Sequence, residues 1–231
     1  MRIIIAIGIL FISSALSAQV KGYLGVRGGG HLSTAYIEHT LYNIVMNTGF
    51  EPGYHGGVML KLFTNQSPTS FLNAGLQSGL LYESKGWRQS FATDEPTYKV
   101  RMNYINMPVE AVIYAGKRKT KYFFTLGVFI EKLVGFNKDV APNEENIGGQ
   151  EFHTFQENRD RDFGYGVRAS LGAHRDFSFG AVHLDAFISY SASNFIRSTD
   201  FSERLPDLSN HYLGGFSVAY LIPFGKMEFS K

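Results

Sequence analysis

The sequence contains no cysteine, few charged residues and no apolar run long enough to cross a bilayer as a helix. Without cysteine, the fold uses no disulfide, no thiolate metal site and no lipid attached to a cysteine. Charged residues make up 18% of the chain, which is low against about 25% in soluble domains. The net charge of +2 gives no reason to expect a nucleic-acid partner.

Glycine and aromatic residues are abundant instead, with 25 glycines and 15% aromatics. Over residues 54–62, 71–86 and 161–174, apolar side chains fall on every second position, with small or polar residues between them. A period of two places the two sets on opposite faces of a β-strand. These strands run over roughly 10–16 residues, against a usual length of about 5–6. Long, glycine-rich strands of this pattern are typical of a β-barrel that crosses a bilayer.

The N-terminus has the pattern of a secretory signal. Arg2 precedes an uninterrupted apolar run over residues 3–12, and mostly small residues follow it. A transmembrane helix would need about 20 apolar residues, roughly twice this run. We therefore expect a signal peptide over residues 1–18, cleaved after Ala18 or alternatively after Ser17.

The rest of the chain, residues 19–231, is expected to form one domain, an eight-stranded antiparallel transmembrane β-barrel with up-and-down meander order. The expected strands cover residues 23–35, 51–63, 71–87, 98–115, 121–135, 161–175, 181–196 and 210–224. Short connections at 64–70, 116–120 and 176–180 alternate with longer ones at 36–50, 88–97, 136–160 and 197–209. Short periplasmic turns and long extracellular loops are the outer-membrane pattern, which predicts that both termini lie in the periplasm.

Period two alone does not say which face points inward. A soluble lipocalin-type barrel, with an apolar interior, is the alternative. The polar face holds mainly glycine, serine and asparagine, which favours a membrane barrel. Aromatics near the strand ends are expected to form an interfacial girdle: Tyr23, Tyr54, Tyr82, Trp87, Tyr122, Phe123, Phe163, Tyr165, Tyr190, Tyr212 and Phe224. Pro108 lacks a ladder donor in mid-strand, so we expect it to mark a bulge or bend.

Several segments resemble one known family. They are residues 25–30, 54–58, 76–82, 104–108 and 162–166, which read GVRGGG, YHGGV, LQSGLLY, YINMP and DFGYG. The chain resembles the PorT-like outer-membrane β-barrel proteins common in Bacteroidota, over nearly all of the mature chain. The resemblance implies an eight-stranded barrel that accommodates Pro108. The family takes its name from a member that is involved in protein secretion. Such proteins often end on an aromatic, whereas residues 225–231 follow Phe224 here, so the assembly signal would end at Phe224 or Phe229.

The polar face provides a candidate network inside the barrel. Eight strands enclose a space that side chains just fill, and buried charges must be paired. We expect a polar plug, with a narrow pore and a small-ligand cavity as alternatives. Glu110, Glu131 and Arg168 lie on adjacent strands and are expected to form its salt bridges. The inward positions are Arg27, His31, His55, Lys61, Gln77, Glu83, Lys85, Glu110, Glu131, Arg168, His174, His183 and Asp185.

Catalytic and metal sites are weakly indicated, and we expect no enzyme activity and no cofactor. Lipid A deacylases and palmitoyl transferases show that barrels of this kind can be enzymes. Ser217 and His211, however, lie six residues apart on one strand, about 20 Å by strand rise. His153 lies in the acidic connection 136–160, which lacks the ligand spacing of a calcium loop. The triple glycine at 28–30 precedes no helix, and a tight strand bend explains it better than a phosphate loop.

The basic turn Lys117, Arg118 and Lys119, with Lys121 beside it, is a candidate partner-binding feature. The expected function is that of a monomeric, integral outer-membrane barrel with a filled lumen and surface loops, in a structural or interaction role. A component of a protein secretion system is the first alternative and a lipid-modifying enzyme the second. Expected partners are outer-membrane lipid and lipopolysaccharide, the barrel-assembly machinery during biogenesis, and secretion or surface partners.

Overall fold

The computed structural model describes residues 20–41, 43–64, 71–89, 98–116, 119–139, 160–197 and 206–224. The long strands are β1 (Val20–His39), β4 (Glu51–Thr64), β5 (Leu72–Gln89), β6 (Tyr98–Ala115), β7 (Thr120–Asp139), β8 (Phe163–Phe177), β9 (Gly180–Ser191) and β10 (Leu208–Phe224). Two short strands, β2 (Ile44–Val45) and β3 (Thr48–Gly49), lie between β1 and β4. Within these residues, no helix has the length and apolar character needed to cross a membrane.

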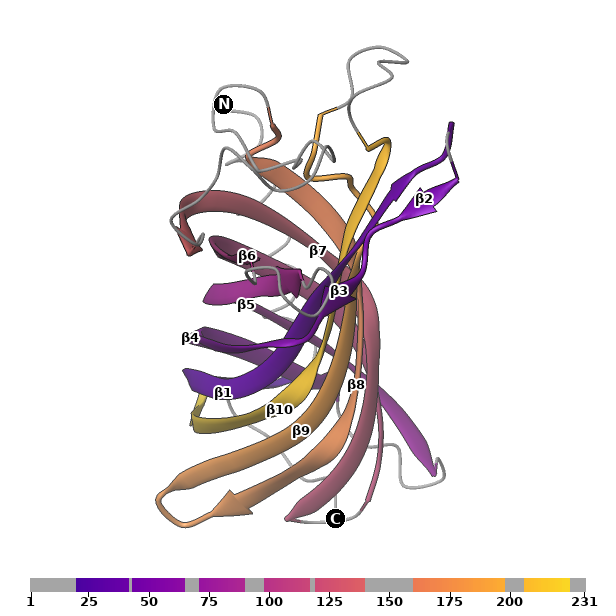
Figure 1. Cartoon of the computed structure of the whole chain (residues 1–231). Coiled ribbons are helices and arrows are strands. Elements are labelled where there is room, and N and C mark those ends of the chain that lie inside the picture. The colour runs from indigo at the N-terminus through magenta and orange to yellow at the C-terminus, as the bar shows by residue number, and fades with distance from the viewer. Residues whose placement is uncertain are drawn as a thin grey trace, which may run out of the picture.

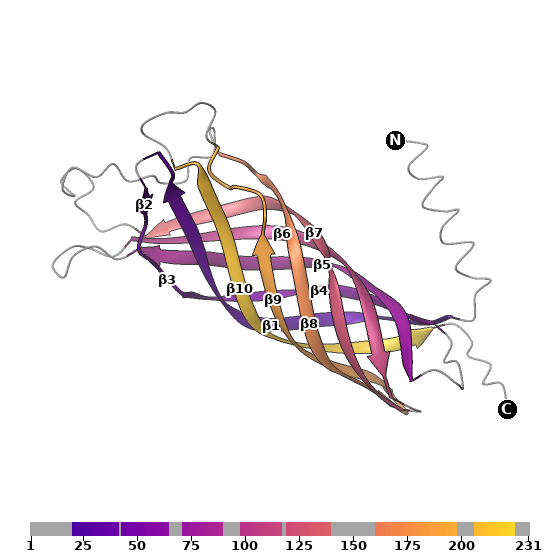
Figure 2. The same ribbon diagram turned by 90° about the vertical axis from the view of Figure 1, so that its right-hand side faces the viewer.

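The long strands form a closed ring in which each pairs antiparallel with its neighbours in the chain, and β10 pairs with β1 (Figures 1 and 2). The closing register runs from Gly22 opposite Phe224 to Glu38 opposite Leu208. The predicted eight-stranded antiparallel barrel is therefore confirmed. The end that carries Val20 and Phe224 is called the short-connection end below, and the opposite end is called the long-connection end.

The outer wall is apolar over most of its height. On β7, alternate side chains Tyr122, Phe124, Leu126, Val128 and Ile130 are 41–66% exposed, whereas the residues between them are buried or partly buried. A closed sheet leaves no unpaired backbone edge, which is the condition for crossing hydrocarbon. The alternation thus forms a continuous apolar surface on the outside of the ring.

Three of the expected girdle aromatics point into the barrel instead. Tyr23 and Trp87 are completely buried, and Phe123 is 5% exposed. The girdle assignment was wrong for these three because each belongs to the inward set of its strand, where it packs at one end of the interior. Tyr54, Tyr82, Tyr122, Phe163, Tyr165, Tyr212 and Phe224 are exposed on the wall, at 36–66%.

Of the bulge or bend expected at Pro108, the bulge is wrong, and the β5–β6 ladder is instead interrupted there, with Gly79/Pro108 and Leu80/Met107 left out of the pairing. On both sides of Pro108, the register between β5 and β6 is the same, with Ser78 opposite Val109 and Leu81 opposite Asn106. The hydroxyl of Ser78 donates to the Pro108 carbonyl at 2.8 Å, so a side chain bonds β5 to β6 beside the residue that lacks an N–H. The register shift lies at Asn103/Tyr104, where Val134 is the extra residue on β7.

Candidate functional site

The interior of the barrel has an apolar cluster at each end and a polar layer between them. The short-end cluster consists of Tyr23, Met59, Phe63, Val112, Tyr114, Phe123, Ala181, Ala219 and Leu221. The long-end cluster consists of Ala35, Ile37, Trp87, Val100, Met102, Tyr104, Phe195 and Ile196. Packed apolar side chains at both ends separate the polar layer from water. The sequence pattern predicted the polar layer but not these two clusters.

The polar layer contains equal numbers of opposite charges. Among the described residues between the two clusters, four cations (Arg27, Lys61, Lys85 and Arg168) face four carboxylates (Glu83, Glu110, Glu131 and Asp185), all at most 4% exposed. The expected inward positions His31, His55, Gln77, His174 and His183 are buried as well. An isolated charge would be very costly in such a place, so neutralisation within the layer is the condition for burying it.

Lys85 and Glu131 form the tightest ion pair of this layer. The Lys85 ammonium donates to both Glu131 carboxylate oxygens at 2.7 Å and to the Ser191 hydroxyl at 3.2 Å. The Asn106 amide lies 3.5 Å from Glu131 and 3.4 Å from Glu83. Asn106 therefore connects this pair with the second group of charges.

Arg168 lies between two carboxylates. Its guanidinium is 3.6 Å from Glu83 and 3.8 Å from Glu110, and it stacks over the ring of Phe187 at 3.7 Å. The expected trio of Glu110, Glu131 and Arg168 is thus divided, because Glu131 pairs with Lys85 and Arg168 takes Glu83 as its other partner. The reason is that these contacts reach across the lumen rather than between adjacent strands. Gln77 and Thr125 donate hydrogen bonds to the two oxygens of Glu110.

A chain of hydrogen bonds connects Lys61 with Arg27. Lys61 Nζ lies 3.2 Å from His183 Nδ1, and His183 Nε2 lies 2.7 Å from Asp185. Arg27 donates to Asp185 at 2.7 and 3.0 Å. An ammonium only donates, so His183 Nδ1 accepts and its Nε2 carries the hydrogen that Asp185 receives. His183 is therefore neutral and relays the attraction between Lys61 and Asp185.

The chain continues on the other side of Arg27. Arg27 donates to the Ser217 hydroxyl at 3.1 Å, Ser217 lies 2.9 Å from His55 Nε2, and the Nδ1 atoms of His55 and His31 are 3.4 Å apart. His31 Nε2 bonds to the Ser84 carbonyl at 3.0 Å. Because a carbonyl only accepts, neutral His31 donates through Nε2 and accepts at Nδ1. His55 then donates from Nδ1 and accepts the Ser217 hydrogen at Nε2.

At the short-connection end, Asp176 collects several donors. Tyr23, Lys21 and Lys121 donate to its carboxylate at 2.6, 3.1 and 3.2 Å. Lys121 is 2% exposed, so the expectation that it adds to the basic turn is wrong: its side chain lies inside the barrel. Lys119 is exposed. Lys117 and Arg118 lie outside the described residues, as do His153 and the predicted signal peptide.

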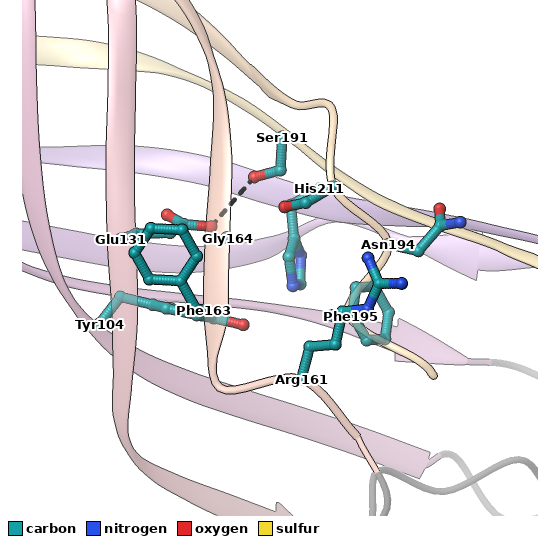
Figure 3. Close-up of a pocket in the computed structure, with 10 residues that line it drawn as sticks. Tyr104, Glu131, Arg161, Phe163, Gly164, Ser191, Asn194, Phe195 and His211 are labelled. Carbon is teal, nitrogen blue, oxygen red and sulfur yellow. Dashed lines mark hydrogen bonds between the residues drawn. The ribbon is translucent and has the colours of Figure 1, made fainter. Parts of the chain in front are cut away.

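A small cavity of about 10 Å³ lies beside the long-end cluster, enough for about one water molecule (Figure 3). In Figure 3 the Ser191 hydroxyl bonds to Glu131 on one side of it, at 3.2 Å, and the His211 ring lies on another. Small-molecule sites have volumes of about 300–1,000 Å³. The cavity is thus far smaller than a ligand pocket.

The Ser217–His55 contact is a nucleophile–base pair by distance, which the sequence did not indicate because β10 and β4 are distant in the chain. Both side chains are buried, at 5% and 3% exposed, and Arg27 donates to the serine oxygen. His211 packs against Trp87 and Phe195 in the long-end cluster, remote from Ser217 as expected. Among the described residues, no three histidine or carboxylate side chains are placed to hold a metal ion.

Residues 16–197 match the family model described as outer membrane protein beta-barrel domain. No curated protein matches the chain in sequence.

Among solved structures, the chain is similar to OprG of Pseudomonas aeruginosa, with 12% identity, a TM-score of 0.45 and coverage of 87% of this chain and 95% of that one. Ail of Yersinia pestis is 11% identical, with a TM-score of 0.36 and coverage of 87% and 99%. Neisserial surface protein A is 12% identical, with a TM-score of 0.39 and coverage of 86% and 96%. Likenesses of this size carry no argument about the function of this chain.

Proposed function

Because the chain belongs to the outer membrane protein beta-barrel domain family and is an integral barrel of that membrane, we propose that it has a non-enzymatic structural or interaction role with a closed lumen. The observation that supports this proposal is the balanced layer of four cations and four carboxylates between two apolar clusters. A conductive path would need water beside these charges, whereas they lie buried among one another and the polar side chains of the same layer. Partners would then bind outside the lumen, at the connections.

The proposed orientation places both termini in the periplasm and the long connections at the cell surface. Its support is the alternation of connection lengths, with β4 and β5, β6 and β7, and β8 and β9 joined by the short ones. The predicted signal peptide over residues 1–18 would direct export, and the barrel-assembly machinery would insert the chain as a monomer. Protease treatment of intact cells tests this orientation. Segment 140–159 should be cut if it faces the cell surface, and it should be protected if it faces the periplasm.

Conductance across a planar bilayer tests the closed lumen. The wild-type protein should insert without steady open conductance. A Glu83→Ala/Arg168→Ala double variant removes one cation and one carboxylate together, so it empties part of the polar layer without changing its net charge. This variant should conduct more than the wild type. Steady open channels in the wild type would overturn the proposal.

A role in protein secretion, which the PorT-like resemblance suggests, is the second candidate. The observation that favours it is the exposed Lys119 in the basic turn that also contains Lys117 and Arg118. Reversing these three charges to glutamate should abolish capture of a periplasmic partner, while deletion of residues 141–158 should leave capture unchanged. The opposite pattern would assign partner binding to the surface connection.

A lipid-modifying activity is the remaining alternative, and Ser217 provides its test. We propose that the Ser217–His55 contact is part of the packed layer rather than a catalytic pair. A fluorophosphonate probe should leave Ser217 unlabelled in the folded protein in lipid. Stoichiometric labelling of Ser217 that is lost in Ser217→Ala would instead favour the enzyme.

A further inference from the structure

The outward side chains of β5, β6 and β7 change from apolar to cationic at the long-connection end. On β7 the apolar series that ends at Ile130 is followed by Lys132, which is exposed. On β6, Arg101 and Lys99 occupy the outward positions near the strand end, and on β5 Arg88 does so. Arg88, Lys99, Arg101 and Lys132 are called the β5–β7 cationic patch.

The other side of the ring ends differently. At the same end, the outward positions of β8, β9, β10 and β1 hold aromatics: Phe163 and Tyr165, Tyr190, Tyr212 and Tyr36. In the described portions of these four strands, no lysine or arginine occupies an outward position at this end. At the boundary of the apolar wall, β5, β6 and β7 therefore carry cations, whereas β8, β9, β10 and β1 carry aromatics. The exposed Arg161 and Arg197 lie just beyond the ends of β8 and β9.

Two like charges face each other within the patch. Arg88 lies directly opposite Lys99 in the β5–β6 register, and both belong to the outward sets of their strands. Like charges in cross-strand pairs are destabilising unless something compensates them. Two carboxylates lie nearby: Glu51 is 3.6 Å from Arg101, and Asp139 is opposite Lys99 in the β6–β7 register. The patch retains four cations against these two anions, and within the described residues Arg88, Lys99 and Lys132 form no ion pair.

The height of the patch suits lipid headgroups. The register places Tyr82, Ile105 and Lys132 in one outward row across β5, β6 and β7, so Lys132 lies two strands from the girdle residue Tyr82 along that row. Arg101 lies four residues beyond Ile105, about 13 Å along the strand, and Lys99 lies about 20 Å along it. With the strands tilted by about 40°, these cations extend from the hydrocarbon boundary into the headgroup layer.

We propose that the β5–β7 cationic patch binds the phosphate groups of a phosphorylated glycolipid of the outer leaflet, with one phosphate between Arg88, Lys99 and Arg101. Guanidinium and ammonium groups are the side chains suited to phosphate, and a bound phosphate neutralises the Arg88–Lys99 repulsion. The aromatic side of the barrel would remain in contact with neutral lipid. The inference rests on the proposed orientation, which exposes the long-connection end to the outer leaflet.

The experiment compares single variants in nanodiscs that contain lipid A, the same lipid with its phosphates removed, or phosphatidylglycerol. The readouts are the glycolipid retained by the protein in native mass spectrometry and the shift in unfolding temperature that each lipid produces. Arg88→Gln and Lys99→Gln remove one phosphate contact each. Arg175→Gln, which changes an exposed cation at the short-connection end, is the matched control.

Lipid A should raise the unfolding temperature of the wild type more than phosphatidylglycerol, which carries a single phosphodiester charge, while dephosphorylated lipid A should not raise it. Each patch variant should bind lipid A about tenfold more weakly, as expected for one lost charge-assisted hydrogen bond, and the control variant should bind like the wild type. Without lipid A, the unfolding temperature of Lys99→Gln should be no lower than that of the wild type, because the substitution relieves the repulsion between Arg88 and Lys99. If Lys99 served only to stabilise the fold, its substitution would lower the unfolding temperature.

Equal retention of lipid A by the patch variants and the wild type would overturn the inference, as would equal stabilisation by phosphatidylglycerol. If Lys99→Gln does not fold, Arg88→Gln and Arg101→Gln decide the question. Nanodiscs carry lipid A on both sides, so binding is measured whatever the orientation in the cell. Failure of the proposed orientation appears separately, in the protease experiment on residues 140–159, and failure of the closed lumen appears in the conductance.

Discussion

Lys85 of β5 reaches past β6 to place its ammonium 2.7 Å from both carboxylate oxygens of Glu131 on β7. Their side chains are 0% and 2% exposed, so each charge depends on the other for neutralisation. Lys85→Met should destabilise the barrel by about 3–5 kcal/mol, because it leaves a buried carboxylate unpaired. The free energy of unfolding in lipid vesicles, measured with denaturant, checks this value.

The matched control for that variant is Lys85→Met/Glu131→Gln, which removes both charges. It should recover a large part of the loss, since no unpaired charge remains. If the double variant is as unstable as the sum of both single variants, the two residues do not interact in the folded barrel.

Gly29 tests the close approach of strands behind the polar layer. A β-carbon at Gly29 would lie 2.0 Å from the Phe216 carbonyl oxygen and 2.8 Å from the His55 ring, whereas one at Gly30 would have its nearest neighbour at 3.8 Å. Gly29→Ala should therefore cost about 1–3 kcal/mol or more in stability. Gly30→Ala, on the outer wall, should stay within about 0.5 kcal/mol. Equal effects of the two substitutions would contradict the inward position of residue 29.

Leu76 tests the lipid-facing wall. It is 44% exposed and belongs to the outward set of β5, between Leu72 and the girdle residue Tyr82. Leu76→Arg should cost about 2–4 kcal/mol in a bilayer, the range for a cation near the midplane of such a barrel. Leu76→Ile keeps the apolar surface and should be nearly neutral. A neutral Leu76→Arg in vesicles would show that this face does not contact hydrocarbon.

How far the sequence predicts this molecule depends on which contacts are local. The period of two on each strand is a local property, so the strands and their order were predictable from apolar spacing and connection lengths. Inward aromatics such as Phe123 were not, because Tyr122, Phe123 and Phe124 form an unbroken apolar run in which no alternation is visible. Such a run at a strand end is the signal of an apolar cluster inside the barrel.

The pairing of charges within the lumen was not predictable for a different reason. Lys85 on β5 pairs with Glu131 on β7, and Arg27 on β1 pairs with Asp185 on β9, so each contact passes over a strand. These partners depend on the tilt and stagger with which the sheet closes. The alternation along each strand therefore predicted the inward residues. The assumption that ion-pair partners lie on adjacent strands predicted the wrong partner for Glu131.

Asp207 provides a pH-dependent contact outside the barrel wall. The Thr40 hydroxyl donates to its carboxylate and lowers the pKa of Asp207 below the usual value, and the Thr40 amide donates to the other oxygen at 2.7 Å. A lowered pKa means that the contact is fully present above about pH 3.9, the unfolded value, and is lost as the pH falls through the folded pKa. Hydrogen exchange of the Thr40 amide should therefore be more protected in the wild type than in Asp207→Asn at pH 6. If the two exchange alike at pH 6, the contact is absent in solution.

The histidine tautomers are a further consequence of the hydrogen-bond chain. Nitrogen-15 spectra of selectively labelled protein should show neutral His31 and His183 with the hydrogen on Nε2, and neutral His55 with the hydrogen on Nδ1. Ser217→Ala removes the donor to His55 Nε2 and should alter the His55 signal while the His183 signal keeps its tautomer. A protonated His183 at neutral pH would contradict the relay between Lys61 and Asp185.

The central claim, a lumen packed with paired side chains, is tested most directly by thiol reactivity, because the chain has no cysteine of its own. Ser170 faces the lumen, is 3% exposed and bonds to Thr125 at 2.6 Å, so Ser170→Cys is a conservative probe of that space. A small water-soluble methanethiosulfonate should leave Cys at position 170 unmodified in the folded barrel and modify it after unfolding. Rapid modification of the folded protein would show that water fills the lumen and would contradict the account.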